Sequence, residues 1–210
     1  MERRRFLKLT GASGLVLLST HSDAQECLEA TQPQTSGPFY PLEEPLDSDA
    51  DLAWVQGQDR IASGIVTNLT GRVLDATGNV IPSARVEIWQ TDAFGFYHHP
   101  RDRGGRAEAQ FQGFGKATVD GTGRYRFRTV RPVAYPGRTP HIHARVYAKG
   151  IEPMTTQIYL SGEPRNGTDY LYNSIPVEKR ADQTIRFPES ETDITPAEFD
   201  FILGHTHECT

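Results

Sequence analysis

Asp120-Gly-Thr-Gly-Arg-Tyr-Arg-Phe-Arg-Thr129 is the stretch that decides the fold. From Arg124 to Thr129 large aromatic residues alternate with arginines, and a period of two is typical of a strand that buries one face. The glycines that precede this run supply the positive φ that a tight turn between strands needs. The stretch therefore predicts a turn followed by a half-buried strand.

Short alternating runs between turn residues recur along the chain from residue 69 onward, without a long helical period. This pattern predicts an all-β fold, an antiparallel β-sandwich with an irregular N-terminal arm. The expected strands are Leu69–Leu74, Ala84–Gln90, Lys116–Val119, Arg124–Thr129, His141–Ala148, Met154–Leu160, Thr184–Phe187 and Phe199–Leu203.

The domain organisation is expected to be simple, because 210 residues suffice for one core and give no reason for two domains. Residues 41–60 are rich in Pro, Asp and Glu and carry no sustained period, which favours a surface arm. We expect an export signal over residues 1–24, an arm over 25–60 and a β-sandwich domain over 61–210.

The chain opens with Met-Glu-Arg-Arg-Arg-Phe-Leu-Lys, followed by an apolar run, Gly11–Leu18, and small residues near Ala24. Arg-Arg-x-Phe-Leu-Lys before a short apolar run is typical of a twin-arginine export signal, and the run is too short to span a bilayer. We expect export to the periplasm or the outside of the cell, with no membrane span. A merely basic amphipathic start is the alternative.

The formal net charge is −5 at pH 7, so nucleic acid is not expected as a partner. The composition is compatible with a homo-oligomer. The chain has only Cys27 and Cys209, and in an oxidising compartment they could form one disulfide that ties the termini together. Free thiols or pairing between chains are the open alternatives.

The richest functional stretch is Tyr135-Pro-Gly-Arg-Thr-Pro-His-Ile-His143. On an extended strand His141 and His143 project from the same side, so they can form a two-nitrogen half-site for a metal. Further ligands are then needed, and tyrosine is a hard phenolate donor that suits ferric iron. Taken alone, the pair is equally consistent with two partly buried structural histidines.

A set of further motifs, taken in order, resembles the intradiol ring-cleavage dioxygenase family, nearest to the protocatechuate 3,4-dioxygenase type. The resemblance runs from about residue 37 to about residue 188. The matching pieces are Gly37–Pro41, Gly71–Asp75 with Gly78, Val86–Gln90 with Tyr97, Phe111–Gly115, Asp120 with Gly123–Thr129, Tyr135–His143 and Thr156–Tyr159.

The resemblance implies a non-haem Fe(III) cofactor at a loop-borne metal site on the β-sandwich. Its ligands would be Tyr97, Tyr135, His141 and His143. The interval between Tyr135 and His141 is shorter than in the iron-bearing subunit of protocatechuate dioxygenase, so the loop over the substrate differs.

The resemblance also implies the reaction, cleavage of a catechol-type ring with O₂ to a cis,cis-muconate-type product. The partners are thus a catecholic small molecule and O₂. Arg138 would stabilise anionic character on the substrate, and Gln157 would orient it by hydrogen bonding. Tyr135 would leave the metal as the catechol arrives and take its proton.

Two other classes of protein share part of this pattern. A non-catalytic transthyretin-like or carboxypeptidase-regulatory-like β-sandwich module shares the spacing of residues seen from Gly71 to Tyr97. Such a module does not need the functional residues of the Tyr135–His143 stretch. A copper or zinc hydrolase could use the histidine pair, but two tyrosinate ligands argue against it on ligand hardness.

Other candidate residues have plainer interpretations. Trp89 is expected in the core, and His98 and His99 are expected to be solvated in a loop. Arg101, Arg103 and Arg106 would receive a carboxylated substrate or only aid solubility. His205 and His207 repeat the His-x-His pattern without tyrosine or arginine partners, which favours a surface position.

Overall fold

The computed structural model describes residues 27–204. The predicted signal over residues 1–24, His205, His207 and Cys209 lie outside this range. No cysteine in the described range is free, but because Cys209 is outside it, the pairing of Cys27 with Cys209 stays a prediction. Between residues 27 and 204 no helix is long and apolar enough to cross a membrane.

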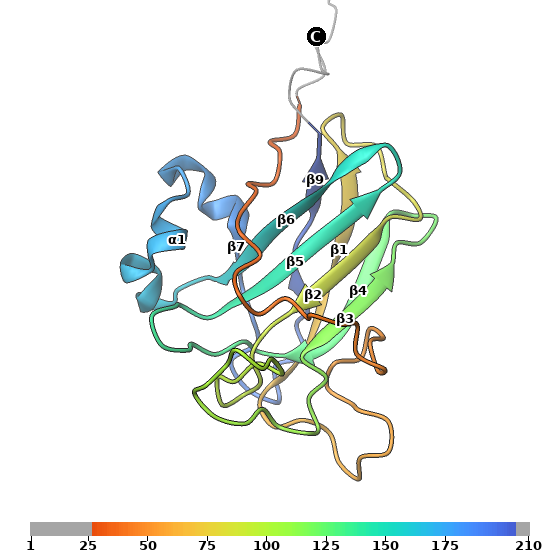
Figure 1. Cartoon of the computed structure of the whole chain (residues 1–210). Coiled ribbons are helices and arrows are strands. Elements are labelled where there is room, and N and C mark those ends of the chain that lie inside the picture. Colours follow the sequence, from red (N-terminus) through yellow and green to blue (C-terminus); the bar gives the residue numbers. More distant parts are fainter. Residues whose placement is uncertain (1–26, 205–210) are drawn as a thin grey trace, which may run out of the picture.

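The first sheet is built around a long strand, β1 (Val66–Asp75). The whole of strand β4 (Arg124–Val130) pairs with β1 in antiparallel fashion, from Val66 opposite Val130 to Arg72 opposite Arg124. The short strands β8 (Ala197–Glu198) and β9 (Phe201–Leu203) both run parallel to β1. This sheet forms one layer of the molecule (Figure 1).

The second sheet carries three of the predicted functional residues, His141, His143 and Gln157. Its strands follow the order β3 (Phe114–Thr118), β2 (Arg85–Trp89), β5 (His141–Ala148), β6 (Ile151–Leu160) and β7 (Thr184–Ile185). The first four pair in antiparallel fashion, whereas β7 runs parallel to β6.

The predicted all-β class is confirmed, but the expectation of a wholly antiparallel β-sandwich was wrong, because both sheets are mixed. The hairpin-linked strands are antiparallel as expected. Strand β7 follows a long connection after β6, β8 follows another loop, and β9 follows β8 closely in the same direction along β1. Only a crossover connection can return a chain in the parallel sense.

One hydrophobic core draws side chains from both sheets. Leu69, Phe127, Ile88 and Ile142 are fully buried in it, on β1, β4, β2 and β5 respectively. In β4 the aromatic residues are buried while Arg124 and the next arginine are exposed, as the alternation predicted. Full burial of each large apolar side chain contributes about 1.5–3 kcal/mol.

The segment before β1 is irregular, but it is not a loose arm. Gln34 N donates to Thr155 O at 2.8 Å, so the arm lies across β6 (Figure 1). Leu52 N donates to Arg128 O at 2.7 Å, and the Leu52 side chain is fully buried in the core. The arm is therefore an integral part of the folded domain.

Between β6 and β7 the chain forms a group of short helices that the sequence pattern did not predict. They are η1 (Pro164–Thr168), α1 (Tyr170–Asn173), η2 (Val177–Lys179) and η3 (Ala181–Gln183). Asp169 caps α1 by accepting from Tyr172 N at 2.8 Å, which satisfies a backbone donor that the helix leaves open. This group lies beside one end of the β5–β6 pair (Figure 1).

Candidate metal centre

The histidine pair lies at the start of β5, and both rings are buried. Their Nε2 atoms are 3.2 Å apart. Burial and the nearby charge of Arg138 lower the pKa of His141 to about 3. Burial also holds the pKa of His143 well below its usual value, so both imidazoles are neutral at pH 7.

The hydrogen bonds assign the tautomer of His141. Its Nδ1 lies 2.6 Å from Thr139 O, and because a carbonyl oxygen only accepts, the proton is on Nδ1. The Nε2 of His141 therefore presents a lone pair towards His143. Two ring nitrogens in this arrangement can hold a cation between them.

Tyr97 lies between β2 and β3, and Tyr135 between β4 and β5. Their ring centroids are 5.5 Å apart, and Tyr135 is the same distance from the ring of His141. The Tyr97 ring lies 6.4 Å from that of His143. The fold thus brings together all four residues for which the sequence predicted a metal role.

The Tyr97 hydroxyl is buried and has no hydrogen-bond partner among residues 27–204. Burial raises the pKa of Tyr97 well above its usual value, and the charge of Tyr135 raises it further. Leaving such a group without a partner is costly, whereas a bound cation would favour its phenolate form. The orphaned hydroxyl is therefore consistent with a metal ligand.

The donor set identifies the kind of metal that fits. Within the described part of the chain no group of three or more His, Cys, Asp and Glu residues could hold a metal ion. A metal here must draw on the tyrosines as well as the histidines. Phenolate oxygens are hard donors, and together with neutral imidazoles they suit ferric iron.

Arg138 reaches into this cluster from the loop before β5. Its Nη2 donates to Gln157 Oε1 at 2.6 Å, so the structure brings the two predicted catalytic residues into contact. Its Nη1 lies 3.5 Å from Tyr135 Oη and 3.4 Å from His141 Nε2. The guanidinium thus directs one edge at the proposed ligands.

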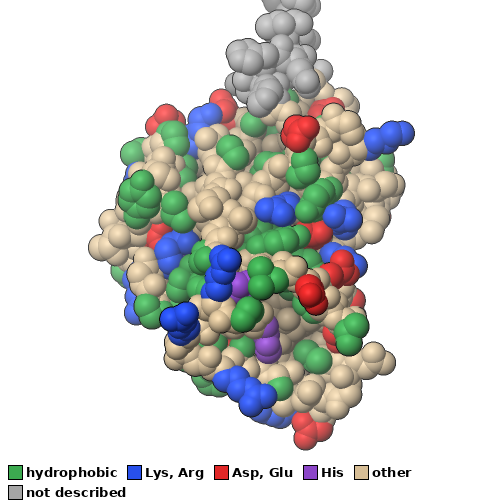
Figure 2. Space-filling model, viewed as in Figure 1, with side chains coloured by type: hydrophobic (Ala, Val, Ile, Leu, Met, Phe, Trp, Pro, Cys, Tyr) green, Lys and Arg blue, Asp and Glu red, His purple; other side chains and the backbone are tan. Residues whose placement is uncertain are grey.

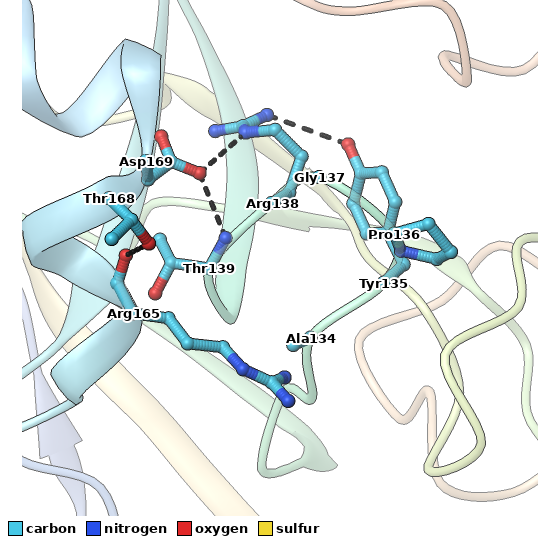
Figure 3. Close-up of a pocket in the computed structure, with 9 residues that line it drawn as sticks. All are labelled: Ala134, Tyr135, Pro136, Gly137, Arg138, Thr139, Arg165, Thr168 and Asp169. Atoms are coloured by element: carbon cyan, nitrogen blue, oxygen red, sulfur yellow. Dashed lines mark hydrogen bonds and ion pairs between the residues drawn. The ribbon is translucent and has the colours of Figure 1, made fainter.

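Asp169 is a site residue that the sequence pattern did not predict. Its carboxylate forms an ion pair with Arg138 Nε at 2.8 Å, and its side chain is fully buried (Figure 3). Although burial opposes it, the contact with Arg138 holds the pKa of Asp169 below its usual value. The pattern of a capping Asp before an apolar turn indicates a helix start, but nothing in it indicates the arginine partner.

The N-terminal arm closes over the cluster. Phe39 stacks on Tyr97 with ring centroids 4.5 Å apart, and Thr35 O accepts from Gln157 Nε2 at 3.0 Å. The backbone of Gly37 passes His143 so closely that a Cβ on this residue would lie 3.3 Å from the Cε1 atom of that ring. No sequence pattern predicted that the arm forms part of the site.

Trp89 is buried, as predicted. His98 is exposed, but the expectation that His99 is solvated was wrong, because it is buried beside Phe39. Burial and the charge of Arg101 lower the pKa of His99. The local sequence suggested exposure because it could not show that the distant arm covers this loop. Figure 2 shows histidine atoms among hydrophobic and basic side chains on this face of the molecule.

A cavity of about 540 Å³ borders the cluster between residues 134–139 and the η1 segment (Figure 3). Tyr135, Arg138 and Asp169 line it together with Arg165, whereas the other proposed ligands do not. The exposed residues Arg101, Arg103 and Arg106 do not line it either. The structure therefore gives no support to this arginine group as a substrate carboxylate receptor.

The comparisons with known proteins agree with this arrangement. A family of dioxygenases matches residues 35–204. The protocatechuate 3,4-dioxygenase beta chain of Burkholderia cepacia is 34% identical over 180 residues, which cover 79% of this chain and 76% of that protein. Catechol 1,2-dioxygenase of Acinetobacter baylyi is 32% identical over 169 residues, which cover 71% of this chain but only 53% of that protein.

A solved structure provides independent agreement. The dioxygenase domain of a dioxygenase carbohydrate-binding protein fusion from Streptomyces sp. SirexAA-E is similar with a TM-score of 0.63 and 26% identity. The similarity covers 83% of this chain and 98% of that domain. The match to the family over most of the chain, with this fold, decides against a non-catalytic sandwich module. The chain belongs to the intradiol ring-cleavage dioxygenases, a family of oxidoreductases that includes protocatechuate, catechol and hydroxyquinol dioxygenases.

Proposed function

We propose that the chain is a non-haem Fe(III) enzyme that cleaves a catechol-type ring between its two hydroxylated carbons, giving a cis,cis-muconate-type product. Both atoms of O₂ enter the product, so the reaction needs no other oxidant or reductant. One observation carries the proposal: Tyr97, Tyr135, His141 and His143 converge, and Arg138 faces Tyr135 Oη and His141 Nε2 at 3.5 and 3.4 Å.

The four converging rings would hold the iron. Tyr97 is suited to remain a ligand because its hydroxyl has no other partner within the described residues. His141 is suited because its Nδ1 is already occupied by Thr139 O, which fixes the ring with Nε2 towards the cluster. When bound, ferric iron would take electron density from the chelated catechol, so that the ring becomes open to attack by O₂.

Tyr135 is placed to handle a proton. It is half-buried, whereas Tyr97 is buried, so it is the tyrosine more accessible to an arriving substrate. Burial raises the pKa of Tyr135, and the charge of Arg138 opposes that rise. Its Oη would take a proton from one catechol hydroxyl on binding, leaving the phenol neutral beside Arg138.

Arg138 and Gln157 would act on the bound substrate. An arginine is always charged, and this one is held in place by Gln157 at 2.6 Å, so it needs little reorganisation to stabilise negative charge that develops on the ring. Gln157 Nε2 is itself held by Thr35 O, which keeps the amide from rotating. The pair thus forms a preorganised polar wall beside the cluster.

The names of the relatives define the class of substrate to test, because they act on protocatechuate, catechol or hydroxyquinol. The test is oxygen uptake by the iron-loaded chain with a panel of these catechols, with the muconate-type product identified by mass. Uptake of one O₂ per ring opened, with both oxygen atoms in the product, is expected. No turnover on any member of the panel by iron-replete, folded protein would contradict the proposal.

For the compartment, we propose export by the twin-arginine route, which suits a protein folded around a metal before transport. Replacing Arg3 and Arg4 by lysine should leave the protein in the cytoplasmic fraction. Export that is unaffected by these changes would contradict the proposed route. A disulfide between Cys27 and Cys209 would then form after transport, and thiol labelling of the unfolded, unreduced exported protein would reveal its absence.

A further inference from the structure

Asp169 is the buried anion of the site, and the proposed mechanism gives it no role. Its carboxylate is fully buried and accepts hydrogen bonds on both oxygen atoms. Oδ2 accepts from Arg138 Nε and from Thr139 N, each at 2.8 Å. Oδ1 accepts from Tyr172 N, also at 2.8 Å. Figure 3 shows the two contacts of Asp169 with the loop before β5.

Each nitrogen of the Arg138 guanidinium contacts a different group. Asp169 takes Nε and Gln157 takes Nη2, which leaves Nη1 directed at Tyr135 Oη and His141 Nε2. Because the guanidinium is planar, two fixed nitrogens determine where the third points. The orientation of Nη1 therefore depends on Asp169 as much as on Gln157.

Thr139 extends the effect of Asp169 to a proposed iron ligand. The amide of Thr139 donates to Asp169, its carbonyl accepts from His141 Nδ1 at 2.6 Å, and its hydroxyl donates to Asn166 Oδ1 at 2.7 Å. One buried residue thus connects the carboxylate to the histidine ring. Asp169 and Asn166 both come from the segment around η1 and α1, so this segment is anchored to the loop before β5.

We propose that Asp169 is a positioning residue, which orients Arg138 for the ring-opening step and ties the short helices to the metal-binding loop. The inference rests on the proposed function, because it concerns the step in which Arg138 stabilises negative charge. The η1–α1 segment would then have a role in turnover, although it lies far along the chain from the proposed ligands.

The first test variant is Asp169→Ser. Serine caps a helix nearly as well as aspartate, so the bond to Tyr172 N can be kept, but its short side chain cannot reach Arg138. We expect iron content and colour to be retained, since no proposed ligand is changed. The kcat should fall by roughly ten- to a hundredfold with little change in KM. Without the contact to Asp169, Arg138 would be less well oriented to stabilise the negative charge that develops on the substrate during the reaction.

The matched control is Asn173→Ala. Asn173 Nδ2 donates to the backbone carbonyls of Asn166, Gly167 and Asp169, so its loss loosens the same segment without removing a contact to Arg138. We expect lower thermal stability with kcat within a fewfold of the parent. A fall in kcat equal to that of Asp169→Ser would mean that packing alone is responsible and would overturn the inference.

A double-mutant cycle with Arg138→Ala separates positioning from a general structural effect. If Asp169 acts through Arg138, then Asp169→Ser should change kcat less than about twofold once Arg138 is absent. Additive losses would overturn the inference. Should the serine variant not fold, Asp169→Asn replaces it in the same cycle, because an amide can accept on only one of its two positions.

The outcomes for the two proposals are distinct. A parent protein that turns over no catechol would contradict the proposed function and the inference with it. A parent that turns over, with Asp169→Ser and Asp169→Asn equally active, would overturn the role of Asp169 alone.

Discussion

The imidazole ring of His143 lies flat against the indole ring of Trp89, with centroids 4.9 Å apart and planes 4° apart. Both rings are buried, and His143 Nδ1 has no hydrogen-bond partner within residues 27–204. No hydrogen bond therefore orients this ring from behind, as Thr139 O does for His141. The stack and the close backbone of Gly37 do so instead.

His143→Ala should lower both iron content and turnover, because it removes one of the proposed ligands. His99→Ala is the matched control, since His99 is also buried but lies outside the cluster of ligands. Metal analysis of both purified variants is the measurement. Full iron retention and normal turnover in His143→Ala would show that His143 is only a core histidine and not a metal ligand.

Tyr97→Phe should abolish or shift the reddish-brown colour expected of phenolate bound to ferric iron. In iron-free protein the same change should leave the free energy of unfolding unchanged or raise it, because the hydroxyl that is removed is buried without a partner among the described residues. Tyr125→Phe is the control, since the Tyr125 hydroxyl donates to Phe199 O at 2.6 Å. Its loss should cost about 0.5–1.5 kcal/mol in urea unfolding. A large loss of iron-free stability in Tyr97→Phe would show that its hydroxyl has another role.

Arg138→Ala should keep iron, colour and the spectral change on catechol binding, but lower turnover by roughly two to three orders of magnitude, as expected when one preorganised electrostatic donor is lost. Arg138→Lys should restore only part of that, because an ammonium cannot contact Asp169, Gln157 and the ligand cluster at once. Steady-state kinetics on the three proteins decides the point. Turnover of the alanine variant within a fewfold of the parent would remove Arg138 from the mechanism.

Gly37→Ala should weaken iron binding. Gly37 has φ of +64°, which costs a residue with a Cβ about 1–2 kcal/mol, and the added atom would press on the ring of His143. Gly57→Ala isolates the backbone strain, because Gly57 has φ of +86° and its Cβ would meet nothing within 4 Å. We expect similar losses of stability but lower iron affinity only at position 37. Equal iron affinity in the two variants would show that the close approach has no effect on the metal site.

The contribution of Asp169 to stability should depend on pH. The native pKa of Asp169 is below its usual value, so its stabilising effect is complete above the unfolded pKa of about 4 and is lost as pH falls through the native pKa. The difference in unfolding free energy between the iron-free parent and Asp169→Asn should therefore shrink below pH 4. Urea unfolding at several pH values measures it, and a difference that stays constant down to pH 2 would contradict the ion pair.

The sequence predicted most of the second sheet because His141–Ala148 and its neighbours are long enough to show alternation. The expected strand Thr184–Phe187 contains β7, but its parallel pairing with β6 was not predicted, because it depends on a long connection. Strand β8 was not predicted, since two residues carry no period. The four proposed iron ligands could be predicted because their motifs resemble those of a known family. Asp169 could not, because its partner lies 31 residues away and only the fold brings them together.

The way in which the arm is anchored has a consequence for the order of assembly. Thr35, which holds Gln157, belongs to a segment that is itself fixed near the other end of the chain, where Thr31 exchanges hydrogen bonds with Ile202 of β9 at 3.1 and 2.8 Å. The arm also contacts β6 through Gln34, but this anchor at Thr31 cannot form before β9 is in place. The cover over the cluster of Tyr97, Tyr135, His141 and His143 is thus complete only when two segments far apart in the sequence have come together, so a partly folded chain that lacks the β9 contacts should leave this cluster more exposed.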